Sequence, residues 1–442
     1  MRSNLEKKLT SSRQYVDSRC RHTGGRLFPS LLRRRGLGRA GVGWRNWEEK
    51  LYMNDKNIVQ AFETSEFRTR LDKARALMSK AGMDALVVSS QADQVYLLGY
   101  EFHAYSPQGV LVTLDDDPYF ILRKMDADTA ADAGCWLPQE RVVGYAESCI
   151  TGSSGEGAWE AIGRFVKDKV GASARIGVEV SALSMVDYPK LVGALGVQEP
   201  LDASDLVATC ALVKSERELF YMREAAMITD RALVAGMDKI AVGTRHCEAA
   251  AAIMSVLCAG AEGIPGGPPP WLPHIRGGRF SNAPHQPWMD DVFAAGEQYF
   301  LELSAARHRH SAPVTRMAHL GPATARRKNQ HEGGLAGLQA AVDTMRPGAT
   351  CGDVARAYDA AIRPYGLTRP SRIGYSIGVD SISGASLAPN NDTEILANMT
   401  FHLQSAFYER GERYMLSDTV RVTENGAELM SAIPHTFVER PA

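Results

Sequence analysis

Residues 273–321 constrain the fold most, because they place ionisable side chains inside short apolar segments. A strand is predicted at 298–304, where Glu302 lies among apolar residues, and a second strand is predicted at 313–320. A loop rich in Gly and Pro precedes both strands and carries His285. Burying a carboxylate is costly unless a partner or a function requires it. We therefore predict that these strands form the rigid floor of a catalytic site, and a solvated hairpin edge is the alternative.

Composition excludes several classes of protein. A chain of 442 residues is too long for one ordinary core, so two domains are expected. The hydrophobic content of 45% and the net charge of -1 are typical of a globular protein without the basic excess of a nucleic-acid binder. No apolar run approaches the roughly 20 residues of a membrane span. Seven cysteines without a C-x-x-C pair favour reduced thiols, and hence a cytoplasmic protein.

The chain divides into three predicted parts. Residues 1–60, rich in Arg, Lys, Gly and Ser, are expected to be a disordered or artefactual basic extension. Helix and strand patterns alternate over 61–207, which predicts an α/β domain. Over 208–442, two helices that begin at capping boxes, Ser215–Glu218 and Thr350–Asp353, alternate with strands that read as antiparallel. This second pattern predicts an α+β domain.

Several motifs in the second domain resemble the pita-bread fold of methionine aminopeptidase, Xaa-Pro peptidase and creatinase. The runs that carry the resemblance are 311–316, 374–378 and 399–404, and the first domain resembles the smaller α/β domain of creatinase. In the peptidases, two Asp, one His and two Glu hold two metal ions. The resemblance implies that the corresponding positions in this chain are Glu302, Ala312, Tyr375, Gln404 and Ser417.

A dinuclear metal site needs several anionic ligands, and only one of these five residues is a carboxylate. The resemblance therefore implies no dinuclear metal site, no other cofactor and no metallopeptidase activity. A mononuclear site rebuilt from His308, His310 or His402 is the alternative.

The chain is more similar to ectoine hydrolase, a metal-free member of the same fold. The similarity lies in the Leu-Glu-Leu-Ser strand around Glu302 and in the runs 312–316, 372–378 and 399–402. Ectoine hydrolases continue after the third run with Pro-Pro-Asp-Trp-Gly-Glu, whereas this chain has a shortened segment at 379–385. The resemblance implies metal-independent hydrolysis of a C–N bond in a small zwitterionic amidine, with ectoine opened to N-acetyl-2,4-diaminobutyrate.

The resemblance also implies residue roles. His285 would take a proton from water and return it to the leaving nitrogen. Glu302 would hold the cationic amidinium by a charge-assisted hydrogen bond. Tyr375 and Gln404 would orient substrate or water, and His402 would contribute to substrate binding. Tyr375 could instead be a core tyrosine whose hydroxyl is satisfied locally.

An arginine is expected to bind the substrate carboxylate. Arg316, Arg372 and Arg123 are the candidates, and Arg123 and Arg372 have surface ion pairs as their alternative interpretation. In the family that the chain resembles, a partner subunit covers the site, so a homodimer with a shared active site is expected. Arg123, Phe102 and Tyr105 would then act across the dimer.

Three other functions stay open. The first is a creatinase-like amidinohydrolase that acts on another guanidino or betaine-like compound, although Thr315 and Gln404 occupy the positions of the creatinase glutamates. The second is a binding protein that has lost catalysis, which the altered segment 379–391 favours. The third is an Xaa-Pro metallopeptidase with unconventional ligands.

Overall fold

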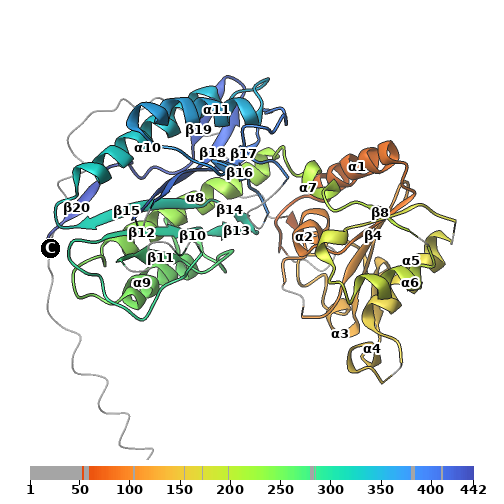
Figure 1. Cartoon of the computed structure of the whole chain (residues 1–442). Coiled ribbons are helices and arrows are strands. Elements are labelled where there is room, and N and C mark those ends of the chain that lie inside the picture. The colour runs from red at the N-terminus through yellow and green to blue at the C-terminus, as the bar shows by residue number, and fades with distance from the viewer. Residues whose placement is uncertain are drawn as a thin grey trace, which may run out of the picture. The chain divides into compact units, whose positions relative to one another are not determined.

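The computed structural model (Figure 1) describes residues 52–53, 59–102, 105–153, 155–171, 173–197, 199–278, 283, 285–379, 384–409 and 412–442. The extension predicted at residues 1–60 lies mostly outside these ranges. None of the helices in the described ranges has the length and hydropathy required to cross a membrane.

The first domain is built on a mixed six-stranded sheet with the order β6-β5-β4-β3-β7-β8. Strands β3, β4 and β5 pair antiparallel, and β6, β7 and β8 add parallel to their neighbours. The bounds are β3 Ala85–Val88, β4 Gly109–Thr113, β5 Tyr119–Arg123, β6 Val142–Tyr145, β7 Ile176–Val178 and β8 Leu201–Asp202. This sheet confirms the predicted α/β organisation.

Helices cover both faces of this sheet, because successive strand residues point to opposite sides. Leu86 and Val88 pack with residues of α1 and α2, whereas Val87 packs with residues of α5 and α6. The helices are α1 Thr64–Ala81, α2 Gln91–Leu98, α3 Lys124–Ala127, α4 Ser148–Thr151, α5 Ala158–Val170, α6 Tyr188–Leu195 and α7 Leu206–Cys210. Gly82 ends α1 in the left-handed conformation, as its sequence position predicts.

The second domain contains an eight-stranded sheet with the order β11-β12-β15-β18-β17-β16, to which β19 and β20 add at β18 and β15. The bounds are β11 His274–Gly277, β12 Gln298–Leu303, β15 Val314–Leu320, β16 Gly374–Ser376, β17 Thr400–Glu409, β18 Glu412–Thr423, β19 Gly426–Leu429 and β20 Val438–Arg440. The strands predicted at 298–304 and 313–320 correspond to β12 and β15, and the sheet is antiparallel along its main path, so the α+β organisation is confirmed.

Helices pack against one face of this sheet. Helices α8 and α9 pack on Leu301 and Val314, and α10 and α11 pack on Leu403 and Leu416. The bounds are α8 Glu216–Met237, α9 His246–Ala259, α10 Ala325–Thr344 and α11 Cys351–Ile362. Figure 1 shows α10 and α11 side by side in blue. We call the opposite side of these strands the inner face.

The two predicted capping boxes are present. Ser215 and Glu218 cap α8, and Thr350 and Asp353 cap α11, each through reciprocal side-chain and backbone hydrogen bonds. The remaining short elements are β1 Tyr52–Met53, β2 Val59–Gln60, β9 Gly260–Ala261, β10 Ile264–Pro265, β13 Ala306–Arg307, β14 His310–Ser311, and the 3₁₀ helices η1 Gln139–Arg141, η2 Val180–Ala182 and η4 Arg363–Tyr365.

Candidate active site

Glu302 lies on the inner face, on a strand with a neighbour on either side. It pairs with His274 on β11 and with Thr315 on β15, and Thr315 in turn pairs with Ser417 on β18. Side chains directly opposite each other in antiparallel strands project to the same side. The register therefore gathers these four side chains on one surface, and Glu302 is only 7% exposed there.

The Glu302 carboxylate is surrounded by positive and polar groups. Arg276 donates a close hydrogen bond to Oε2, and His274 Nδ1 lies 3.4 Å from the same oxygen. Burial raises the pKa of Glu302, but the His274 hydrogen bond and the Arg276 charge lower it more, so the pKa falls to about 2. Glu302 is therefore ionised at neutral pH, as its predicted role in binding a cation requires.

A second hydrogen-bonded group surrounds His402. Its Nε2 lies 2.7 Å from Ser417 Oγ, which donates to Thr315 Oγ1 at 2.8 Å. Because the Ser417 hydroxyl proton is used there, Nε2 carries the imidazole proton and Nδ1 is an acceptor. The Tyr375 hydroxyl lies 3.1 Å from Nδ1, and Gln404 Nε2 lies 3.3 Å from it.

Protonation in this group follows from burial. Burial lowers the pKa of His402 to about 4, although the Glu302 charge opposes that shift. Burial and the Glu302 charge together raise the pKa of Tyr375 to about 12. At neutral pH, Tyr375 is thus a hydrogen-bond donor and His402 is a neutral acceptor. The structure brings the predicted residues Tyr375, His402 and Gln404 together on the inner face.

Three charged or titratable residues of this surface were missed by sequence reasoning. His274 and Arg276 are alternate residues of β11 and share the face of Glu302, and Arg413 lies on β18. The spacing of two residues between His274 and Arg276 is the available signal, because it marks one face of a strand. The sequence alone does not reveal that this strand pairs with β12.

His285 lies next to His274. The centroids of the two imidazole rings are 6.2 Å apart with the rings edge to face, and His285 is exposed. The neighbouring residues 279–282 and 284 lie outside the described residues. The structure thus places His285 beside the Glu302–His274 pair, on its solvent side.

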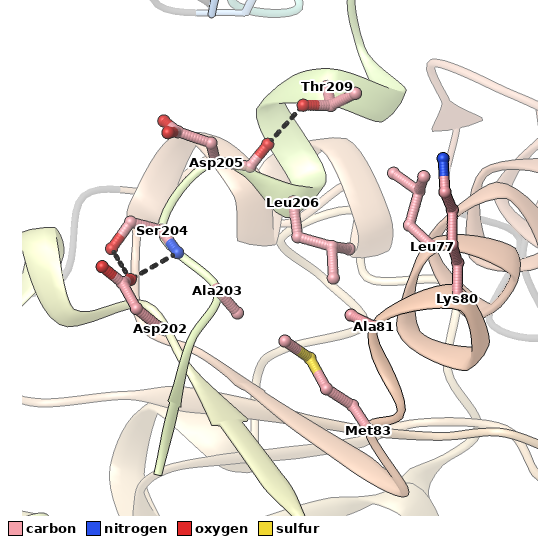
Figure 2. Close-up of a pocket in the computed structure, with 10 residues that line it drawn as sticks. All are labelled: Leu77, Lys80, Ala81, Met83, Asp202, Ala203, Ser204, Asp205, Leu206 and Thr209. Carbon is pink, nitrogen blue, oxygen red and sulfur yellow. Dashed lines mark hydrogen bonds between the residues drawn. The ribbon is translucent and has the colours of Figure 1, made fainter.

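Two cavities lie elsewhere in the described residues. One of about 520 Å³ is in the first domain (Figure 2), where Leu77 and Met83 face Leu206, and Asp202 accepts hydrogen bonds from Ser204. Another, of about 610 Å³, is lined by α10 together with Leu403, Asp418 and His435. Neither is lined by Glu302. We identify the site by its buried ionised carboxylate and its aligned donors rather than by volume.

Comparison with known proteins places the chain in a family. Residues 221–424 match the model of metallopeptidase family M24, and residues 70–213 match the creatinase/prolidase N-terminal domain. An uncharacterized hydrolase/peptidase of Sinorhizobium fredii is 34% identical over 385 residues, which are 85% of this chain and 97% of that protein. The chain belongs to the M24 family. It is therefore placed among the hydrolases of that family.

Two further relatives of this M24 protein bear on fold and function. The ectoine hydrolase of Halomonas elongata is 28% identical over 395 residues, which are 84% of this chain and 97% of that protein. The crystal structure of dipeptidase PepE from Mycobacterium ulcerans is 22% identical, covers 86% of this chain and all of that one, and has a TM-score of 0.72. The second likeness shows the fold and confirms the predicted pita-bread class.

The family description implies a metal ion, and the side chains around Glu302 do not fit one. Glu302 already contacts the Arg276 guanidinium, a cation that would repel a divalent ion. Its inner-face neighbours Thr315, Gln404 and Ser417 are neutral. In the part of the chain that the structure describes, no group of three or more His, Cys, Asp or Glu side chains could hold a metal.

The other expectations about metal ligands need correction. Ala312 does not share the face of Glu302. It packs in the apolar cluster under α8 and α9, and Thr315 is the strand partner of Glu302. His308 Nδ1 lies 2.7 Å from Glu101 Oε1. His310 Nε2 lies 3.1 Å from Oε1 of Glu218, a residue of α8. Of the three histidines of the mononuclear alternative, His308 and His310 are therefore engaged away from Glu302, and His402 shares its face.

Arg316 is held on the helix-covered side of the sheet. Its guanidinium donates to Asp418 Oδ1 at 2.8 Å and to the Ser417 and Ile433 carbonyls at 2.8 and 2.7 Å. These bonds follow from alternation, because Arg316 points away from Thr315 and hence from Glu302. The expectation that Arg316 binds a substrate carboxylate is therefore wrong, and we assign it a structural role.

The other predicted binding residues lie at the surface. Arg372 stacks on the Tyr375 ring, with Cζ 4.5 Å from the ring centroid. Arg123 forms a two-pronged ion pair with Glu147, in which Nη2 lies 2.7 Å from Oε2. This is the surface ion pair that the sequence left open as the alternative interpretation. Further exposed residues are Phe102 and Tyr105, at 59% and 94% exposure.

Proposed function

We propose that this protein is a metal-independent hydrolase of a C–N bond in a small zwitterionic amidine, and that ectoine is the first substrate to test. The observation that carries the proposal is the single ionised carboxylate, Glu302, buried beside an arginine and neutral hydrogen-bonding groups. An amidinium is a planar cation that binds such a carboxylate by charge-assisted hydrogen bonds. The similarity to ectoine hydrolase along 97% of that protein supports ectoine as the candidate.

Glu302 is proposed to bind the amidinium. Among the described residues, both side-chain partners of Glu302 contact Oε2, which leaves Oε1 as the acceptor for an amidinium N–H. Water would then attack the amidine carbon. One C–O bond forms and becomes the acetamide carbonyl, one ring C–N bond breaks, and both protons of the water end on the leaving nitrogen as an ammonium group, which gives N-acetyl-2,4-diaminobutyrate.

His274 and His285 are proposed to carry the proton. His274 Nδ1 faces the ionised Glu302, so that nitrogen holds the ring proton and Nε2 is the available base. His285 lies beside this ring and is exposed, which suits exchange of the proton with solvent. This assignment keeps His285 in the proton transfer and adds His274 as the group that contacts the substrate.

Tyr375 is proposed to orient the attacking water or the substrate. It is held by His402 Nδ1 at 3.1 Å, and His402 is itself held by Ser417. A hydroxyl that is anchored by such a buried chain of hydrogen bonds keeps its orientation when the substrate binds. Gln404 contributes an amide to the same acceptor.

A homodimer with a shared site is part of the proposal. The exposed aromatic side chains of Phe102 and Tyr105 are large apolar groups that a second copy would cover. Arg123 would exchange its Glu147 partner for the substrate or for the other subunit.

Product analysis tests the proposed reaction. Ectoine, 5-hydroxyectoine, creatine and an Xaa-Pro dipeptide are each incubated with chelator-treated protein, and products are identified by mass spectrometry. We expect N-acetyl-2,4-diaminobutyrate from ectoine. Cleavage of creatine alone would favour the amidinohydrolase, and cleavage of the dipeptide only after addition of divalent metal would overturn the proposal.

Two variants separate the roles of the histidines. His274→Ala should abolish turnover. His285→Ala should retain part of it, and added imidazole should restore the rate, because an exposed relay can be replaced by a small buffer. If His285→Ala turns over ectoine at the parent rate without imidazole, the relay assignment is wrong.

A further inference from the structure

Two buried arginines on the inner face have hydrogen-bond donors without acceptors. Arg276 and Arg413 come from β11 and β18 and lie over the same Phe300 ring, with Cζ 4.7 and 5.1 Å from its centroid. The Arg276 side chain is fully buried, and Arg413 is 5% exposed. Nε and Nη1 of both residues make no hydrogen bond to any described residue.

The two guanidinium groups lie close together. Nη2 of Arg276 is 3.8 Å from the Met415 sulfur, and Nη2 of Arg413 is 3.7 Å from the same atom. Arg413 also donates to the Tyr408 hydroxyl at 2.7 Å, and Arg276 donates to Glu302. Their remaining donors therefore have no acceptor among the described residues, and both guanidinium groups lie against Phe300.

Among the described residues, the charges in this region do not balance. Glu302 is the carboxylate of these residues that contacts the pair, and it contacts only Arg276. Burial and the neighbouring Arg276 charge lower the pKa of Arg413 to about 10, so it stays charged at neutral pH. A buried cation without a partner is unfavourable, and buried donors normally have acceptors. A ligand that brings a negative charge and several acceptor oxygens would correct both defects.

We propose that Arg276 and Arg413 form a carboxylate-binding subsite that fixes the orientation of the substrate. A carboxylate matches the two-pronged geometry of guanidinium groups. Arg276 joins this subsite to Glu302, so a substrate would place its cationic amidinium on Glu302 and its carboxylate on the arginines. The inference rests on the proposed function. It narrows the substrate class to zwitterions whose amidinium and carboxylate are separated by about the width of one guanidinium group, because Arg276 lies between Glu302 and the proposed position of the carboxylate.

The test measures binding apart from turnover. Calorimetry measures the affinity of three proteins for ectoine and for its neutral carboxamide. All three proteins carry His274→Ala: one keeps Arg413, one has Arg413→Gln and one has Arg413→Lys. We expect Arg413→Gln to weaken ectoine binding at least about tenfold and to leave carboxamide binding unchanged, because a hydrogen bond to a charged group is lost only for the acid. Arg413→Lys should recover part of the affinity, because it keeps the charge but not the planar fork.

Thermal unfolding without ligand gives a second readout. Removing a structural arginine destabilises the protein, whereas removing a buried cation that has no anion beside it should leave the melting temperature unchanged or raise it. Arg346→Gln is the control, because Arg346 is an exposed arginine of the same domain to which no role in the site is assigned. Equal loss of affinity for ectoine and its carboxamide, or a lower melting temperature with unchanged ectoine affinity, would overturn the subsite.

Failure of the subsite can be distinguished from failure of the proposed function. If ectoine is not hydrolysed but raises the melting temperature of the parent and not that of Arg413→Gln, the subsite stands and the reaction is wrong. If ectoine is hydrolysed but Arg413→Gln binds acid and carboxamide as the parent does, the reaction stands and the subsite is wrong.

Discussion

Replacing Glu302 by Gln should reveal how strongly the inner face depends on one ionised carboxylate. Its pKa is lowered from 4.5 to about 2, a change that corresponds to about 3 kcal/mol of folding stability at neutral pH. Its side chain is only 9% exposed, so solvent screening reduces this value little. Glutamine keeps the size of the side chain but leaves the Arg276 guanidinium without its anion.

The sign of the pH dependence follows from the lowered pKa. The folded state favours the ionised form, so the stabilisation is complete above pH 4.5 and is lost as the pH falls towards 2. The stability difference between parent and Glu302→Gln should therefore be about 3 kcal/mol at pH 6 and should shrink by about 1 kcal/mol at pH 3.5.

Urea unfolding followed by circular dichroism measures this difference at each pH. Glu297→Gln is the matched control, because Glu297 lies just before the same strand and is only half-buried. The control should track the parent at every pH. A Glu302→Gln protein as stable as the parent at pH 6, or a difference that does not change with pH, would refute the electrostatic reasoning.

Three further predictions concern neighbouring groups. The folded state lowers the pKa of His402 from 6.5 to about 4, so the neutral imidazole contributes stability above pH 6.5 that is lost as the pH falls. In urea titrations, the difference in free energy of unfolding between the parent and His402→Gln should move by about 2 kcal/mol in favour of the variant between pH 7 and pH 5. Arg316→Gln breaks a buried ion pair and should destabilise the fold by about 3–5 kcal/mol in the same assay, while leaving the KM for a carboxylate substrate unchanged. Co-expression of Glu302→Gln with Arg123→Gln should restore about a quarter of the parent activity, because half of the dimers are mixed and each mixed dimer has one intact shared site. Activity no higher than that of the two variants alone would contradict the shared site.

Local signals in the sequence were sufficient for the elements and for part of the site. The capping boxes at Ser215 and Thr350 begin helices as predicted, because their hydrogen bonds are local. Glu302 was recognised because it is a carboxylate inside an apolar strand, and Gln404 was recognised through the family resemblance; both lie on the inner face.

Long-range register was not available from the sequence. A shift of one residue moves a side chain to the other face of a sheet, so the sequence did not show that Ala312 packs under α8 and α9 while Thr315 is the strand partner of Glu302. The same alternation turned Arg316 away from Glu302. Arg276 and Arg413 are separated by more than a hundred residues. They lie on β11 and β18, and only the strand order β11-β12-β15-β18 brings them to one aromatic ring.

The most direct test of the account is product formation from ectoine by protein that has been stripped of metal. Chelator-treated parent protein and Glu302→Gln are incubated with ectoine, metal content is measured by mass spectrometry, and the product is quantified by chromatography. The account predicts N-acetyl-2,4-diaminobutyrate from the metal-free parent and none from the variant. Absence of product until a divalent ion is added back would contradict it.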